Sequence, residues 1–395
     1  MQRRQFLKLA GGGIVLAAAA GTLGGCSMFE VPASAVAAWQ GPDKDVELRH
    51  WILSYALLAP NPHNRQPWIA DLRTEGQIAL RLDTDRLLPA TDPFGRQILM
   101  GAGAFLELLV MAAAERGYRA EVRLFPDGEP GEKLDAKDFA RVQLTKEEGI
   151  ARDPLFAHVL ARRTERRAYD VSRPISAEES GRLSAVASSQ PVTFGIAGTL
   201  AAPAADAERI VRIRSIAREA WRIELSTEPT MMESMRLLRL GGAEIDRYRD
   251  GITITSPLLV ILAKTGLFDR NQFPASDSQA TQGQIRDFDA ITASTPSYLW
   301  IVTRGNRREQ QIAAGRAYVR VNLAGTAMGL VMHPNEQSLQ EFKEVAGPYR
   351  DIHTLLEAPA PDYTVQMLAR LGRLPAGSDP APPAPRRGLS AHLAA

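Results

Sequence analysis

The chain has 395 residues, of which 45% are hydrophobic and 23% charged, a balance typical of a soluble globular protein of one to three domains. Its formal net charge of +2 is too small to favour a nucleic-acid partner. The single cysteine excludes an intramolecular disulfide and any metal site built on several thiolates.

Residues 1–25 predict an export signal. Arg3 and Arg4 stand together near the start, and an apolar stretch rich in Ala and Gly runs from residue 9 to residue 25. This pattern resembles the signal that the twin-arginine export machinery reads. An N-terminal membrane anchor is the alternative, but so many small residues make the segment only weakly hydrophobic. Without Arg3, Arg4 and Lys8 the net charge falls from +2 to −1, so the mature body is nearly neutral.

The signal ends at Leu23-Gly24-Gly25-Cys26, which resembles a lipobox, where the new N-terminal cysteine is acylated. The alternative is an unmodified cysteine inside a discarded signal. Residues 26–45 contain Ala, Pro, Gly and Ser and read as a tether. The predicted location is therefore periplasmic, and a lipid on Cys26 is the only expected contact with a membrane.

The body predicts two units. The first, residues 46–152, alternates apolar runs with turn residues and predicts helices at 45–58 and 97–117 and strands at 78–82, 119–125 and 139–145, with 69–71 leading from the loop towards a strand. The second, residues 153–375, predicts helices at 154–163, 177–188, 204–225 and 307–332 and strands at 191–197, 297–303 and 365–371.

Two segments do not fit these units. Residues 226–296 have no counterpart in the first unit and include a polar stretch that is a candidate cover. Residues 376–395 form a Pro-rich tail that cannot supply a core element. Either this tail is disordered, or it wraps the body and delivers Arg386 and Arg387 to some site.

The loop at 59–68 is the most polar connection in the first unit. Two prolines, Pro60 and Pro62, stop the preceding helix, and amide, imidazole and guanidinium groups follow before Trp68. The loop reads either as a ligand-lining segment or as a surface connection that ends in a core tryptophan.

Other catalytic chemistry finds little support in the sequence. The six histidines show no metal-ligand spacing, and there is no nucleophile elbow, Walker loop or dinucleotide fingerprint. The run Arg162-Arg163-Thr164-Glu165-Arg166-Arg167 suits a phosphate ligand, because a guanidinium makes paired charge-assisted bonds. The alternative is a solvated basic helix end, which the helix dipole favours by itself.

Four stretches in this order resemble the nitroreductase-like family of FMN-binding proteins, in the long branch where one chain is similar to two fused subunits. They are 59–68, 91–96, 162–169 and 366–372 with the prolines and Pro385-Arg386-Arg387 that follow. The resemblance covers roughly residues 46 to 390 and implies an α+β fold with a central mixed or antiparallel sheet flanked by helices. One chain would mimic the usual dimer, either as a monomer or with further pairing.

The resemblance also implies FMN at the interface of the two halves. The residues that match the family's cofactor-binding positions are Arg163, Thr164, Arg166 and Arg387 for the phosphate and Asn64, Gln66, Pro67 and Trp68 for the ring. The implied function is two-electron reduction of nitro- or quinone-type small molecules by ping-pong flavin chemistry. No catalytic residue is named, since a single loop histidine such as His63 is more often structural. A covered flavin would instead indicate a non-catalytic FMN storage or sensing protein.

Overall fold

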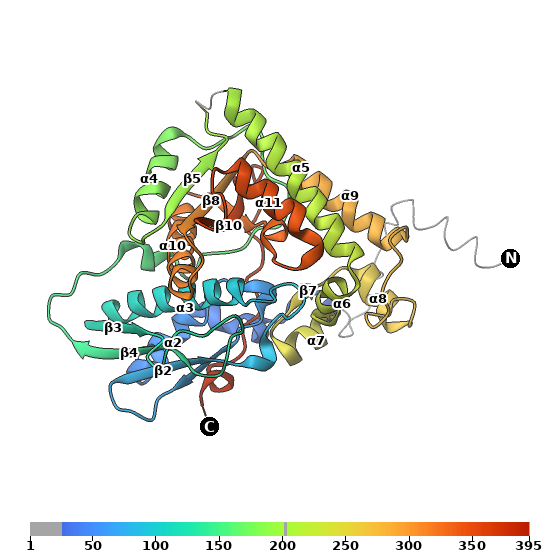
Figure 1. Ribbon diagram of the computed structural model, residues 1–395. Helices are drawn as coiled ribbons and strands as arrows, with labels where there is room; N and C mark the ends of the chain where they lie inside the picture. The colour runs from blue at the N-terminus through green and yellow to red at the C-terminus, as the bar shows by residue number, and fades with distance from the viewer. Residues whose placement is uncertain (1–25, 201–203, 395) are drawn as a thin grey trace.

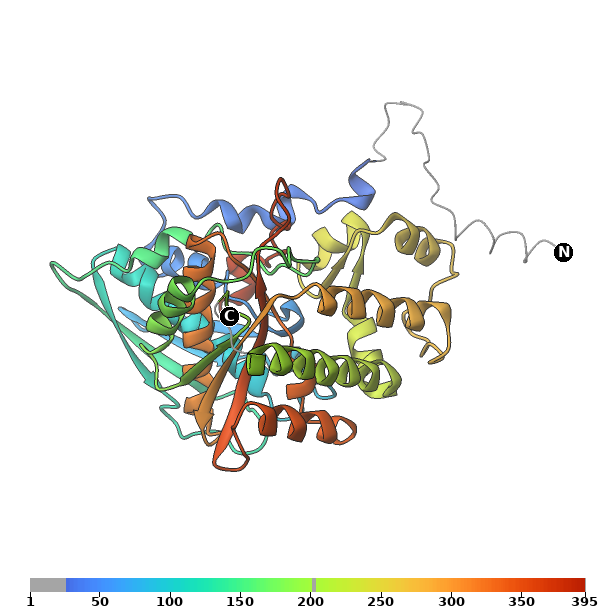
Figure 2. The ribbon, with the colours of Figure 1, turned by 90° about the horizontal axis from the view of Figure 1, so that it is seen from above.

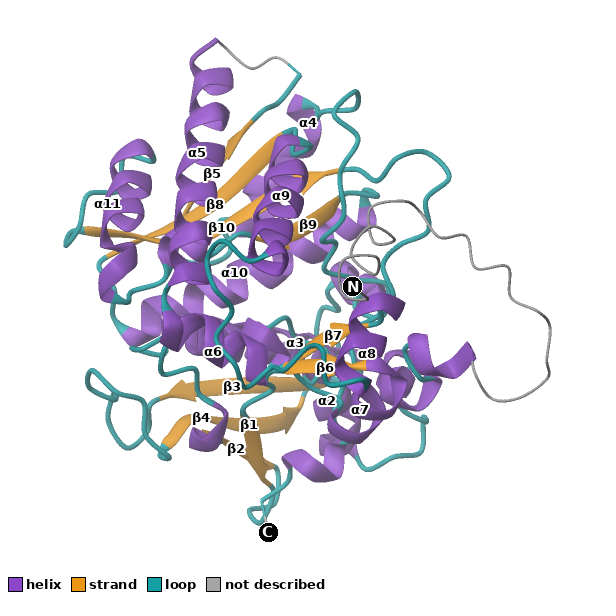
Figure 3. Ribbon diagram, turned by 90° about the vertical axis from the view of Figure 1, so that its right-hand side faces the viewer, coloured by secondary structure: helices purple, strands orange, loops and turns teal. Residues whose placement is uncertain are grey.

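The computed structural model describes residues 26–200 and 204–394, so the predicted export signal at 1–25 lies outside the described part. The fold is α+β. The strands of the described part form two four-stranded sheets and one two-stranded sheet (Figure 3). Both large sheets are antiparallel throughout. The expected α+β fold with antiparallel-type pairing is confirmed, and its strands are divided between two sheets, one in each half.

The first half is formed by α2 (Leu48–Ala56), β1 (Trp68–Asp71), β2 (Gln77–Leu82), α3 (Arg96–Glu115), β3 (Tyr118–Leu124) and β4 (Asp138–Lys146). Its strands lie in the order β1-β2-β4-β3. Strand β2 alternates buried and half-buried side chains, so one face of this sheet contributes to a core that α3 also lines.

The second half is formed by α4 (Ala177–Ala187), β5 (Thr193–Ala197), β8 (Ser297–Arg304), α10 (Arg308–Ala327), β9 (Val331–Pro334) and β10 (Tyr363–Gly372). Its strands lie in the order β5-β8-β10-β9. Helix α11 (Ala346–Leu355) is added between β9 and β10. Leaving additions aside, both halves run helix, strand, strand, helix, strand, strand, and their sheet orders match position by position. The two halves are therefore structural repeats.

The two central helices join the halves (Figure 1). Gly103 of α3 lies so close to the carbonyl of Ile312 on α10 that a Cβ atom there would overlap it, and Gly315 of α10 stands in the same relation to the carbonyl of Met100 on α3. Each glycine is the eighth residue of its helix, and each facing carbonyl belongs to the fifth residue. The contact is therefore reciprocal, as in the interface of a two-fold symmetric dimer.

The second half carries a large insertion between β5 and β8, where the first half connects β1 and β2 through residues 72–76 alone. Residues 198–296 contain α5 (Ala204–Ser226), α6 (Glu228–Arg236), β6 (Leu238–Leu240), α7 (Gly241–Tyr248), β7 (Ile252–Ile254), α8 (Pro257–Lys264) and α9 (Gln279–Ala293). Strands β6 and β7 pair in parallel. Figure 2 shows that α6 to α9 lie to one side of the repeated halves.

Two helix predictions are wrong, one in where the helix ends and one in the type and length of the helix. The helix predicted at 307–332 stops at Ala327, because Gly329 adopts a left-handed φ of 67° and the chain turns into β9. The helix predicted at 154–163 is a short 3₁₀ segment, Pro154–His158. The longest helix is α5, with 23 residues.

The tail returns to the first half. The backbone N–H of Arg386 donates to the carbonyl of Ala35, and the N–H of Ala394 donates to the carbonyl of Ala70 on β1. Leu393 pairs with Ala70 in a parallel bridge, so the tail covers the free edge of that sheet. Of the two alternatives for the tail, wrapping around the body is the one observed.

Helix α3 is long and apolar enough to cross a bilayer, but 94% of its most apolar stretch is buried inside the protein. Its composition therefore reflects its place in the core between the halves.

Substitution of either interface glycine tests the joint between the halves. We expect Gly103→Ala and Gly315→Ala each to lower the free energy of unfolding by about 2 kcal/mol or more, because the added methyl group has no space beside the facing backbone. The matched control is Gly181→Ala in α4, where nothing lies within 4 Å and a gain of about 0.5–1 kcal/mol is expected. Urea unfolding measures all three, and equal stability of the three variants would contradict the close packing.

Candidate functional site

The loop at 59–68 is held in an uncommon backbone conformation. His63, Asn64 and Gln66 all have positive φ values, of 45°, 50° and 49°. Such conformations cost free energy for residues other than glycine and persist only where neighbouring groups hold them. The side-chain oxygen of Asn61 accepts a hydrogen bond of 2.8 Å from the N–H of Gln66 and so closes the loop on itself.

The side chains of Asn64 and Gln66 bind other parts of the chain. Asn64 donates to the carbonyl of Pro385 at 3.0 Å and accepts a bond from Arg386 at 2.7 Å. Gln66 is fully buried, donates to the carbonyl of Arg249 at 2.8 Å and accepts a bond from the N–H of Arg387 at 2.9 Å. These two amides therefore join the loop to the tail and to the insertion.

Pro67 and Trp68 lead into the core. The Trp68 side chain is 1% exposed and packs against Phe105 of α3, with 4.8 Å between ring centroids. Its carbonyl lies 2.9 Å from Nδ1 of His392 in the tail. The faces of this indole are thus used for packing within the first half.

Three arginines surround Trp39, a residue of the predicted tether. The guanidinium carbons of Arg162, Arg163 and Arg386 lie 5.4, 4.7 and 5.2 Å from the centroid of the indole ring. The structure therefore brings Arg163 together with Arg386 and not with Arg387. The double arginine at 386–387 identified the right segment, but sequence alone did not indicate which of the two points inward. Nothing in the tether sequence singled out Trp39.

Arg386 fastens the tail to the end of α2. It is buried and donates to the carbonyls of Leu57, Leu58 and Ala59. Burial, together with the charges of Arg162 and Arg163, lowers its pKa to about 9. Because its donors are satisfied by carbonyl oxygens, this arginine is a structural clamp.

A second group of residues includes polar atoms without a partner among the described residues; we call it the Arg166 cluster, and it consists of Arg162, Thr164, Arg166, His63 and His333. Nδ1 of His333 lies 3.2 Å from the guanidinium of Arg370. The Arg166 side chain is exposed and makes no hydrogen bond to the described residues, while Nε of Arg162 and Nδ1 of His63 are buried without a partner there. Desolvation nevertheless lowers the pKa of Arg166, so protein atoms surround much of this exposed side chain.

The histidines of the Arg166 cluster are neutral near pH 7. Burial and the charge of Arg166 lower the pKa of His63 to about 4 and hold the pKa of His333 well below its usual value. The adjacent carboxylate, Glu165, pairs with Arg167 at 2.7 Å. Within the described part of the chain, no carboxylate lies within ion-pair distance of Arg162, Arg163 or Arg166. Cationic donors without a carboxylate suit a bound anion.

The Arg166 cluster draws on both halves. His63 comes from the loop of the first half, Arg162 to Arg166 from the link between the halves, and His333 from β9 of the second half. Arg162 also donates to the side chain of Asn322 on α10 at 3.3 Å. Thr164 and Arg166 were expected from the sequence, whereas His333 was not; it lies in β9, directly after the end of the helix predicted at 307–332.

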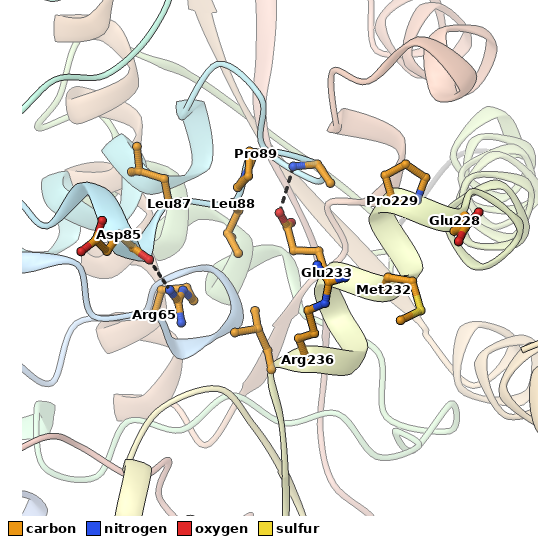
Figure 4. Close-up of a pocket in the computed structure, with 12 residues that line it drawn as sticks. Arg65, Asp85, Leu87, Leu88, Pro89, Glu228, Pro229, Met232, Glu233 and Arg236 are labelled. Carbon is orange, nitrogen blue, oxygen red and sulfur yellow. Dashed lines mark hydrogen bonds between the residues drawn. The ribbon is translucent and has the colours of Figure 1, made fainter. Parts of the chain in front are cut away.

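Arg387 occupies a different neighbourhood. Burial lowers its pKa, and its nearest charges are those of Arg86, Asp83, Asp250 and Arg65. Arg65 itself lines an open cleft of about 600 Å³ between residues 85–90 and α6 (Figure 4). The apolar wall of this cleft is contributed by Leu87, Leu88, Pro89, Pro229, Met232 and Leu237. Glu233 closes one side through a 2.9 Å bond from the N–H of Ala90. The volume suits a small organic molecule.

The described residues include no group of three His, Cys, Asp or Glu side chains placed to hold a metal ion. The chemistry available near the loop is therefore that of cationic and neutral nitrogen donors.

Comparisons with known proteins were made along the whole chain. No protein-family model matches it. It is 29% identical over 356 residues to the Mycobacterium tuberculosis protein named "Putative NAD(P)H nitroreductase Rv3131", which covers 88% of this chain and 91% of the relative. It is 28% identical over 346 residues to "Putative NAD(P)H nitroreductase acg" of the same organism, covering 85% and 91%.

Among solved structures, a nitroreductase with bound FMN from Bacteroides fragilis aligns over 58% of this chain and 93% of its own, with 12% identity and a TM-score of 0.35. The sequence similarity to the first of these relatives covers 88% of the chain, which is more than either half alone contains. Along most of its length, this chain is similar to proteins that are named as putative NAD(P)H nitroreductases.

Proposed function

We propose that this protein binds FMN and acts as an FMN-dependent oxidoreductase that reduces small nitro- or quinone-type molecules. The observation that carries the proposal is the Arg166 cluster, a set of unpaired donors between two repeated halves. The names of the relatives and of the solved neighbour support the same chemistry.

The residues present fit a phosphate group. Within the described part of the chain, the guanidinium of Arg166 and the buried Nε–H of Arg162 have no hydrogen-bond partner. Thr164 lies between them in sequence, and its hydroxyl is also free of bonds to these residues. Residues 162, 164 and 166 lie in an irregular stretch of the link between the halves. Two charge-assisted bonds and one hydroxyl contact would hold a phosphate monoester firmly.

When bound, FMN would supply two-electron transfer, with donor and acceptor binding in turn. The chain's own residues would hold and orient it. Arg162 and Arg166 would supply positive charge, whereas His63 and His333 would stay neutral and offer ring nitrogens. Asn64 and Gln66 would fix the loop through their bonds to the tail and the insertion. Arg163, Pro67, Trp68 and Arg387 would support the loop from the side that faces away from FMN.

The cleft beside Arg65 is our candidate route for small substrates. It lies against the same loop that carries His63, and its wall is mostly apolar with charged groups at the margin (Figure 4). Flat, weakly polar acceptors such as nitroaromatics and quinones suit such a wall.

One observation favours a second function, FMN storage or sensing. The insertion bonds directly to the loop, through Gln66 to the carbonyl of Arg249 and through the N–H of Gly251 to the carbonyl of Asn64. A segment fastened in this way would restrict access to a flavin beneath it.

We further propose that the chain is exported folded, with FMN inside, by the twin-arginine route and is acylated at Cys26 in the periplasm. The paired Arg3 and Arg4 and the sequence before Cys26 support this proposal.

Arg166→Ala tests the phosphate site. We expect affinity for FMN to fall by about tenfold to a hundredfold, since one charge-assisted contact is worth about 1.5–3 kcal/mol. Stability should be unchanged, because Arg166 makes no side-chain bond to the described residues. Flavin released by acid and fluorescence titration measure the effect, with the exposed Arg182→Ala on α4 as control. Equal FMN affinity in both variants would remove Arg166 from the site.

Anaerobic reduction separates the enzyme from the storage protein. We expect NADH, NADPH or a quinol to bleach the bound flavin and a nitroaromatic to restore its absorbance. Ala90→Phe narrows the cleft without removing a packed side chain and should raise KM for that acceptor several-fold at unchanged FMN content. If dithionite reduces the bound flavin but NADH, NADPH and the quinol do not, the result would favour the storage function.

Mass spectrometry of the membrane-fraction protein tests the modification. The expected product starts at Cys26 and carries acyl chains. The Cys26→Ser variant should lack these chains, and a larger share of it should appear in the soluble fraction. An unmodified N-terminus in the wild-type protein would disprove acylation.

A further inference from the structure

Helix α8 exposes an unusual concentration of apolar side chains. Leu258, Ile261 and Leu267 are 60%, 47% and 70% exposed, so three large exposed hydrophobic residues lie within ten positions of the chain. Leu258 and Ile261 are three residues apart and so share one side of the helix, while Val260 faces inward and is buried. Leu267 follows the helix and is fixed by a 2.9 Å bond to the carbonyl of Leu262. We call these three residues the α8 surface.

Single exposed hydrophobic residues are ordinary, but a group on one helix marks an interaction site. The α8 surface lies on the insertion, away from the joint between the halves (Figure 1). It is separate from the Arg166 cluster and from the cleft, whose linings contain none of its residues.

The start of the described chain lies beside this surface. The short 3₁₀ segment Cys26–Phe29 packs against α7, and a Cβ atom on Gly241 would lie 2.9 Å from the carbonyl oxygen of Met28. Lys264, the last residue of α8, contacts Met28 as well. Figure 2 shows the first segment next to the insertion. Any anchor attached at Cys26 would therefore hold α8 close to the bilayer.

We propose that the α8 surface docks on a lipid bilayer, with Leu258, Ile261 and Leu267 at the boundary between headgroups and acyl chains. Lys264 lies at the end of the helix, where its long side chain can reach the headgroups. A small apolar surface gives only weak membrane binding alone, and a second anchor next to it makes the attachment firm. The proposal concerns attachment and does not depend on the flavin proposal.

Vesicle flotation tests the docking with the mature chain from residue 26 carrying Cys26→Ser, which cannot be acylated and lacks the apolar segment at 9–25. Vesicles of phosphatidylglycerol and phosphatidylethanolamine serve as the probe. We expect this protein to float with the vesicles and the additional changes Leu258→Ser, Ile261→Ser and Leu267→Ser to reduce its partition coefficient by about tenfold or more. Salt should have little effect, since Lys264 is the only charged residue of α8.

The matched control carries Val171→Ser and Val211→Ser, two residues that are 60% and 61% exposed elsewhere. It should float like the parent. Equal flotation of the triple variant and the parent, or no flotation of the parent, overturns the proposal. A parent that forms dimers in light scattering, and a triple variant that does not, would also overturn it and assign the α8 surface to a second copy of the chain. Circular dichroism confirms that all variants are folded.

Discussion

The close contact between α3 and α10 is the constraint on which the rest of the structure depends. Two helices can approach to backbone distance only where neither carries a side chain, and here Gly103 and Gly315 each provide that gap for the other. Behind each helix lies one four-stranded sheet, so this single contact fixes the position of both sheets. The link that carries Arg162 to Arg166 runs between the halves, and its geometry follows from their spacing.

Around this frame, buried arginines organise the segments that are not repeated. Arg386 makes five hydrogen bonds, and four of them tie the tail to the end of α2 and to the loop at 59–68. Such bonds stabilise a buried cation only when the donors are satisfied, and here carbonyl and amide oxygens satisfy them. Arg166, by contrast, stands without such partners. The difference separates an arginine that builds the site from one that is available to a ligand.

Much of the architecture was predictable from the sequence. Apolar patterns identified α2, α3, α4, α5 and β10 to within a few residues, because the first four are long enough to show a helical pattern and β10 is a mostly apolar run that is buried on both faces. Strand β9 was missed because it has four residues and follows a helix of similar composition, and only the left-handed turn at Gly329 separates them. Short strands that form through distant pairing leave little local signal.

The site was predictable in its segments but less so in its individual side chains. The link at 162–167 and the loop at 59–68 were expected to form the site and stay predictions as cofactor-binding segments, whereas the structure places Arg386 and not Arg387 with Arg163 at Trp39. Asn64 and Gln66 were expected to face a ligand, whereas their side chains bind the tail and the insertion. Which partner an amide chooses depends on segments more than 180 residues away, so local sequence could not reveal it.

The repeat also has a consequence for stoichiometry. A dimer with two-fold symmetry would present two equivalent positions at its joint, each with its own loop. Here eleven residues separate α2 from β1, whereas five separate α4 from β5, and the insertion and the tail both contact the longer loop. The two positions have thus become unlike, and only one retains the polar loop. Within the described residues, a repeated framework therefore carries a single polar loop of this kind, and one FMN per chain is the ratio that the proposed site predicts.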